Sequence, residues 1–111
     1  MIAAEYLTRD VVLFRFYPGP HKNPFDPFCG TCVFLIDPLW PTRGWIKGLH
    51  GAVTRTHLIA MSTWLYHGGF EIAYAERING KRLPGFTQLE GFQMTRVEWW
   101  IERFNLPPKG P

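Results

Sequence analysis

The stretch from Trp45 to Pro84 constrains the fold more than any other, because four elements follow one another in it without a break. A β-branched and aromatic run comes first, followed by apolar residues at helical spacing and then by strict alternation. These patterns predict a strand, a helix, a second strand and a short return strand, at residues 45–49, about 54–67, 70–78 and 81–84.

Local signals place the ends of these elements. Thr54 is a favourable helix N-cap, and Val53 can pack against Leu58 as a hydrophobic staple. Gly68 and the glycine after it supply the left-handed conformation that ends many helices. The dipeptide Asn79-Gly80 is the strongest hairpin signal in the chain and predicts the turn into the return strand.

Three further segments have a clear pattern. Residues 11–17 are β-branched and aromatic and predict a strand, with Leu13 and Phe14 on opposite faces. Residues 32–37 are almost all apolar, which predicts a strand covered on both faces. Residues 96–104 predict a second helix that starts at a capping box of Thr95 and Glu98, although apolar alternation there also fits a strand.

The length of 111 residues suits one domain, so residues 1–111 are predicted to share a single core. Prolines make residues 18–28 a surface loop, residues 85–93 lack a clear period and are expected as loop, and residues 105–111 form a flexible tail. The predicted fold is therefore a small α+β domain, mostly antiparallel, with the main helix and the second helix on one face of the sheet.

Composition bounds the class of protein. Hydrophobic residues make up 46% of the chain and aromatic residues 16%, so most of it should fold, with rings left over for the surface. The net charge of +3 permits contact with nucleic acid without requiring it. With no secretory signal or membrane-length apolar run, we expect a cytoplasmic protein without a membrane partner. Accessory proteins of bacteria and phages often have this build.

The residues capable of catalysis or metal binding form no complete signature. Cys29 and Cys32 have the spacing of a redox pair or half a zinc site, but they lead into a strand, and the histidines lack zinc-ligand spacing. Two reduced thiols are the simpler interpretation. His57 is expected as a surface or capping residue, and His67 as a partner of the helix dipole. We therefore predict no catalytic residue, no metal and no cofactor.

A loop between strand and helix offers an alternative function. Arg43, Lys47, His50 and Arg55 lie in or beside residues 47–55, where backbone amides before a helix can hold an anion. The order of strand, loop, helix and strand resembles the centre of acyl-coenzyme A-binding acetyltransferases, which implies an enzyme or a domain for an anionic ligand. The Arg/Gln-x-x-Gly-x-Gly/Ala pattern of those enzymes is missing at residues 47–56.

A second alternative is nucleic-acid binding. Arg77, Lys81 and Arg82 surround the predicted Asn79-Gly80 turn, where a basic hairpin beside exposed aromatic rings could follow a phosphate backbone. Charged turns are also ordinary surface features, and Glu71 and Glu76 interrupt the positive charge.

The tryptophans carry the main functional prediction. Neighbouring residues on a helix point about 100° apart, so Trp99 and Trp100 cannot both face one core and one of them should be exposed. Trp40 and Trp45 complete an expected apolar contact surface. We therefore predict a small non-catalytic protein that binds another protein through these tryptophans. Homodimerisation through Trp99, Trp100 or a free sheet edge is part of this prediction.

Overall fold

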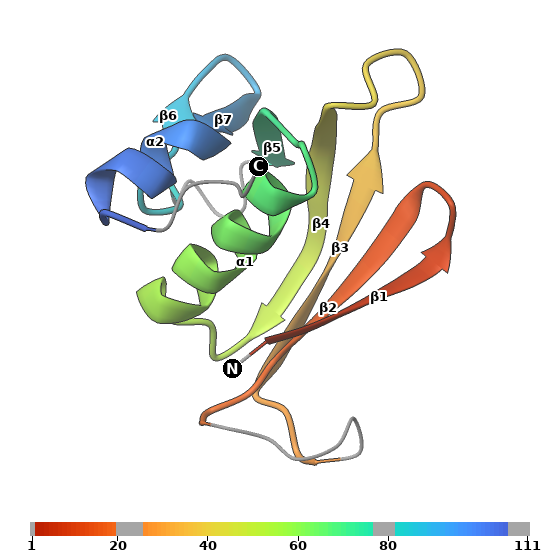
Figure 1. Ribbon diagram of the computed structural model, residues 1–111, viewed down its shortest axis with the longest axis vertical. Helices are drawn as coiled ribbons and strands as arrows, with labels where there is room; N and C mark the ends of the chain where they lie inside the picture. Colours follow the sequence, from red (N-terminus) through yellow and green to blue (C-terminus); the bar gives the residue numbers. More distant parts are fainter. Residues whose placement is uncertain (1, 20–25, 77–81, 107–111) are drawn as a thin grey trace.

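The centre of the fold is the predicted succession of strand, helix and strand. The computed structural model describes residues 2–19, 26–76 and 82–106. In it β4 (Arg43–Gly51) is followed by α1 (Arg55–His67) and β5 (Ile72–Glu76), and β4 and β5 pair in parallel. A parallel pair needs a crossover connection, which α1 supplies. Figure 1 shows α1 crossing the sheet between the two strands.

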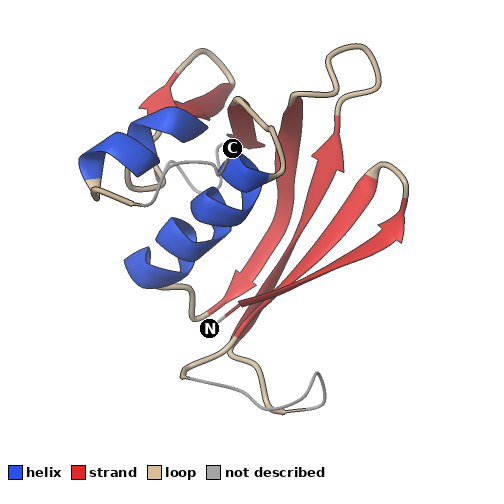
Figure 2. Cartoon of the chain, in the orientation of Figure 1, coloured by secondary structure: helices blue, strands red, loops and turns tan. Residues whose placement is uncertain are grey.

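The remaining elements extend this centre on both sides. β1 (Ile2–Thr8), β2 (Val11–Phe16) and β3 (Gly30–Ile36) precede β4, whereas β6 (Thr87–Gln88), β7 (Phe92–Arg96) and α2 (Val97–Arg103) follow β5. The strands of the described residues join one seven-stranded sheet in the order β1-β2-β3-β4-β5-β7-β6, antiparallel except for β4 and β5. The predicted α+β class, with its mostly antiparallel sheet, is confirmed (Figure 2).

Helix α1 begins and ends at the residues that the sequence indicated. The Thr54 hydroxyl accepts a hydrogen bond from the His57 amide, and His57 Nδ1 accepts one from the Thr54 amide, which makes a reciprocal cap. At the other end, Gly69 has a φ of 86°, which favours glycine. Leu58, Met61 and Leu65 are buried, as the predicted stripe required.

The core lies between the helices and one face of the sheet. Alternate residues of the strands are buried there beside α1 and α2, which lie next to each other on the same side in Figure 1. The largest of these strand residues are Phe14, Phe16 and Phe34. Phe34 and Phe70 meet edge to face, with ring centroids 5.1 Å apart. Both predicted helices therefore cover a single face.

Helix α2 resolves the ambiguity at residues 96–104 in favour of a helix, but its expected capping box is wrong. Arg96 is the N-cap residue and makes no side-chain cap. Thr95 instead belongs to β7, where its hydroxyl donates to the Gly85 carbonyl at 3.0 Å and accepts from Trp100 Nε1 at 2.9 Å. Thr95 thus ties the turn at residues 83–86 to α2.

Several strand predictions need correction. No strand was predicted at residues 2–8, where β1 pairs with β2. The return strand at 81–84 is wrong in its described part, residues 82–84, because β7 is the antiparallel neighbour of β5. The expected loop at 85–93 contains β6 and the start of β7. β3 is covered on one face only, since Val33 and Leu35 are not buried.

Parts of three predictions lie outside the described residues. They are the Asn79-Gly80 turn, most of the proline-rich loop at 18–28 and most of the tail at 105–111. Within the described ranges, neither helix is long and apolar enough to cross a membrane.

Candidate functional site

The face of the sheet without helices carries the most distinctive side chains of the molecule. The strand register aligns one residue from each of five neighbouring strands, so their side chains share this face. We call this set the open-face row, and it consists of Val11, Leu35, Trp45, Tyr74 and Met94. With strands about 4.8 Å apart, the row is about 19 Å long. None of its members is fully buried.

β5 shows how strongly apolar side chains favour this face. Ala73 and Ala75 point toward the helices and are buried, whereas Ile72 and Tyr74 point to the helix-free face. The small alanines allow the helices to approach the sheet closely, so the larger side chains of this strand do not contribute to the core. Burial of apolar area alone would have favoured Ile72 and Tyr74 in the core and the two alanines on the helix-free face.

Three aromatic rings make the centre of the face a continuous cluster. Trp45 stacks against Tyr74 with centroids 5.0 Å apart and an interplanar angle of 28°. Phe92, from β7, contacts both rings, at 5.8 Å from Trp45 and 5.9 Å from Tyr74. Contacts of this kind stabilise a pair by about 0.5–1.5 kcal/mol beyond the burial of area. The cluster is therefore held in a fixed arrangement before any partner binds.

Two cations flank the aromatic cluster. The Arg43 guanidinium donates to the Tyr74 hydroxyl at 3.2 Å and lies 5.4 Å from the centre of the Trp40 ring. The Lys47 ammonium lies 5.1 Å from the centre of the Trp45 ring and forms an ion pair with Glu76. Arg43 thus links Trp40 to the open-face row, and Lys47 covers the Trp45 ring.

The four predicted partner-binding tryptophans separate into different environments. Trp40 is 57% exposed on the β3–β4 turn, where the Asp37 carboxylate accepts from its amide at 3.2 Å. Trp45 lies in the open-face row. Trp99 is 40% exposed on α2 and Trp100 is 1% exposed in the core, so the predicted difference between them is confirmed. Trp100 is therefore removed from the partner-binding set.

The candidate anion residues of the loop at 47–55 do not converge. Register places Arg43, Lys47 and His50 on the helix-free face, with a bulge in β4 between Lys47 and His50. Arg55 is at the start of α1 and contacts Phe104 of the C-terminal segment. The amides of this loop are also partly used, since Ala52 donates to the Cys29 carbonyl at 2.8 Å.

His57 is buried, so its capping role is found but its expected surface position is wrong. Its Nδ1 accepts from the Thr54 amide, which leaves the proton on Nε2, and Nε2 donates to the Tyr17 carbonyl at 2.6 Å. This side chain is committed to the structure, with both ring nitrogens occupied.

The basic hairpin at 77–82 lies almost entirely outside the described residues. Of its candidate residues Arg77, Lys81 and Arg82, the structure describes Arg82 alone, and this residue is exposed. Nucleic-acid binding through this hairpin stays a prediction.

The two cysteines are free thiols in different surroundings. Cys29 donates to the Phe16 carbonyl at 3.3 Å, whereas Cys32 is in the core beside the Met61 sulfur, 3.8 Å away. Burial raises the pKa of Cys32 to about 12. No group of three or more potential metal ligands occurs among the residues that the structure describes.

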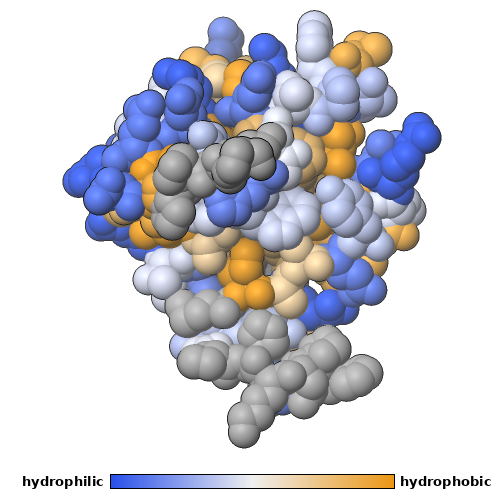
Figure 3. Space-filling model, in the orientation of Figure 1, coloured by the Kyte–Doolittle hydropathy of each residue, from blue (hydrophilic) through white to orange (hydrophobic). Residues whose placement is uncertain are grey.

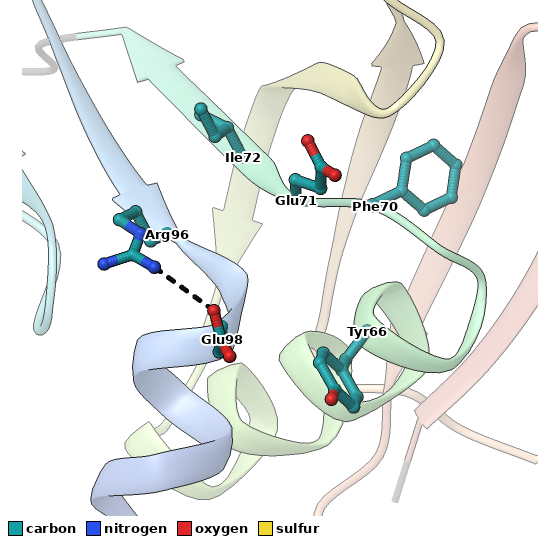
Figure 4. A pocket seen from close by; sticks show the side chains of 6 residues that line it. All are labelled: Tyr66, Phe70, Glu71, Ile72, Arg96 and Glu98. Carbon is teal, nitrogen blue, oxygen red and sulfur yellow. Dashed lines mark hydrogen bonds and ion pairs between the residues drawn. The ribbon is translucent and has the colours of Figure 1, made fainter. Parts of the chain in front are cut away.

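A hollow of about 400 Å³ lies at the end of α1 and the start of α2. Figure 4 shows Arg96 and Glu98 joined by an ion pair of 3.1 Å on one side, with Tyr66 and Phe70 across from them. In the figure the Glu71 carboxylate turns away from this ion pair, and it accepts from the Thr42 hydroxyl at 3.3 Å. The polar groups that line the hollow do not converge on a common point, so the hollow lacks the geometry of a reaction centre.

Sequence reasoning named Trp45 as a candidate but missed Phe92 and the other four members of the open-face row. Alternation predicts Phe70, Ile72 and Tyr74 on one face, but Phe70 is buried in the core, and the pattern did not show which face the helices would cover. In the view of Figure 3, hydrophobic residues reach the surface as separate patches between hydrophilic ones.

Comparisons with models of protein families, with characterised proteins and with solved structures give no match for this chain.

Proposed function

We propose that this protein is a non-catalytic interaction protein whose helix-free sheet face binds another protein. The observation that carries the proposal is the open-face row, in which apolar and aromatic residues of five strands line up with no described element over them. Trp, Tyr and Met are enriched at protein interfaces, and the two aromatic residues bury large areas at low entropic cost. Trp40 extends the surface at one side through its contact with Arg43.

The arrangement of rings favours a protein over a single-stranded nucleic acid. Base stacking requires a free ring face. Trp45 is stacked on Tyr74 and has the Lys47 ammonium over its ring, so its aromatic surface is already in use. Lys47 is also neutralised by Glu76, which lowers its attraction for phosphate. A protein partner can pack against the outer edges of the rings without displacing these contacts.

Site-specific photo-cross-linking tests the proposal in cells that express the protein. A photoreactive phenylalanine analogue replaces Leu35, which is 36% exposed in the open-face row, or Trp99, which is 40% exposed on the helix side. We expect one discrete protein adduct from position 35, resistant to nuclease and lost when Trp45→Ala is added. Position 99 is the control of similar exposure and should give no such adduct.

Other outcomes separate the alternatives. Equal adducts from both positions, or an adduct at position 35 that persists in Trp45→Ala, would refute binding through the sheet face. An adduct removed by nuclease would favour nucleic acid. An adduct of twice the chain mass that contains only this protein would identify the partner as a second copy.

A further inference from the structure

A second recess, on the helix side of the sheet, combines positive charge with an exposed indole. It has a volume of about 180 Å³ and lies between the start of α1, the end of α2 and the turn at residues 83–86. We call it the arginine cleft, and the residues that matter for its chemistry are Arg55, Gly85, Trp99, Arg103 and Phe104.

The two arginines line the same recess, and neither forms an ion pair with an acid of the described residues. The Cζ atoms of Arg55 and Arg103 lie 4.6 Å and 5.5 Å from the centre of the same Phe104 ring. Among the described residues, the ion pairs involve other cations, namely Arg15, Lys47 and Arg96. Two guanidinium groups that line one recess repel each other, and an anion bound in that recess would relieve the repulsion.

The number and kind of cations indicate the anion. A guanidinium offers a planar set of donors that matches phosphate or carboxylate oxygens, and two of them match the double charge of a phosphate monoester. Neither arginine has to give up an ion pair to bind it. The cleft therefore suits a phosphate group better than a singly charged anion.

Trp99 adds a surface for a planar group beside the arginines. Its described ring contacts are both nearly perpendicular, at 86° to Trp100 and 88° to Phe104. No described aromatic ring lies flat on this indole, in contrast to Trp45, which is covered by Tyr74. A planar ring attached to the phosphate can stack on Trp99, as nucleic-acid bases stack on aromatic side chains.

The walls of the cleft are fixed before a ligand binds. Gly85 has a φ of 78°, and a side-chain carbon there would come within 2.6 Å of Trp99 Cζ3, so glycine allows the turn to approach the two indoles. The Thr95 hydroxyl bonds to both the Gly85 carbonyl and Trp100 Nε1. A preorganised cleft loses less entropy on binding.

We propose that the arginine cleft binds a small organic phosphate that carries a planar ring, with a nucleoside monophosphate as the representative ligand. The phosphate lies between Arg55 and Arg103, and the ring stacks on Trp99. This proposal is independent of protein binding by the sheet face, because the cleft shares no residue with the open-face row.

Isothermal titration of the full chain with adenosine monophosphate tests this assignment. We expect Arg55→Gln and Arg103→Gln each to weaken binding by about tenfold or more, the effect of losing one charge-assisted contact. Trp99→Leu should also weaken it. Arg9→Gln, which removes the same charge from the exposed β1–β2 turn, should leave the affinity unchanged. Trp45→Ala, in the sheet face, should also leave it unchanged.

A competition titration on the unmodified protein tests the proposal in a way that does not depend on whether the variants fold. Inorganic phosphate should displace the nucleotide at higher concentration, and adenosine should not bind measurably. Absence of nucleotide binding at millimolar concentration would overturn the proposal. Equal losses in Arg55→Gln and Arg9→Gln would also overturn it, because they would show attraction to the overall positive charge. Adenosine binding as strong as that of the nucleotide would exclude the role of the arginines.

Discussion

At the scale of single residues, His57 connects the start of α1 to the end of β2. Its Nδ1 accepts from Thr54 and its Nε2 donates to the Tyr17 carbonyl, so one imidazole satisfies two backbone groups. A buried backbone group without a partner costs about 1–3 kcal/mol. The capping position was visible in the sequence, but the second bond was not, because Tyr17 is far away along the chain.

Cys32 gives a prediction that depends on pH. Burial raises the pKa of its thiol from 9.0 to about 12, so the folded state holds the proton while the unfolded state loses it. Below pH 9.0 the thiol is protonated in both states and its contribution to stability is complete. Above that pH ionisation favours the unfolded chain, and the free energy of unfolding falls by up to about 1.4 kcal/mol per pH unit.

The measurement compares the wild-type protein with Cys32→Ala by urea unfolding from about pH 8 to about pH 10.5, a range in which the unfolded thiol titrates. The difference in unfolding free energy should shrink as pH rises, since all other titrating groups are common to both proteins. A difference that stays constant would mean that Cys32 ionises as readily in the folded state, against its burial beside Met61.

At the scale of elements, the turn before β6 predicts a large effect from a small substitution. Gly85→Ala should destabilise the protein for two reasons, the φ of 78° and the approach of the new carbon to Trp99 Cζ3 and Trp100 Cζ2 at 2.6 Å and 2.7 Å. Overpacking of this kind costs about 1–3 kcal/mol. Urea unfolding followed by circular dichroism measures the change.

Gly91→Ala is the matched control for this prediction. Gly91 has a similar φ of 82°, but a side-chain carbon there would meet nothing within 4 Å. It should show only the backbone cost, about 1–2 kcal/mol for a left-handed non-glycine residue. If both variants lose the same stability, the close packing of the turn against α2 is not a constraint on Gly85.

The elements differ in how far the sequence determines them. α1 was predictable from end to end because Thr54 and Gly68 mark its ends locally. The partner of β5 was not, because Asn79-Gly80 favours a local hairpin, whereas in the sheet β7 lies between β5 and β6. Local turn chemistry cannot show such an insertion, which depends on pairing between distant residues.

At the scale of the whole molecule, the candidate interface is a property of the sheet and of no single segment. Trp45 was predicted from the sequence to be a contact residue, and helical geometry correctly separated exposed Trp99 from buried Trp100. The open-face row was not predictable. β3 and β5 carry apolar residues on both faces, and the sequence does not show which face the helices cover. Because α1 and α2 lie on the same side of the sheet, the apolar residues on its other face have no described helix over them.

This division between core and interface predicts a graded series of tryptophan substitutions. Trp100→Ala should cost about 3–5 kcal/mol, because the side chain is buried and bonded to Thr95, and large-to-small changes in a core have this size. Trp45→Ala should cost about 1–2 kcal/mol, from the lost stacking on Tyr74 and partial burial. Trp40→Ala, at a residue 57% exposed, should stay within about 0.5 kcal/mol of wild type.

Equilibrium unfolding in urea with circular dichroism orders the three variants on one scale, and Trp100→Phe keeps the most damaging position measurable if the alanine variant does not fold. The result for Trp45→Ala distinguishes a contact surface from a second core layer. A small loss in the free energy of unfolding, together with loss of the cross-link at position 35, assigns the Trp45 side chain to binding. An interface residue can be removed without harm to the core. A cost for Trp45→Ala as large as that for Trp100→Ala would make the sheet face a second core layer and would contradict its role as the contact surface.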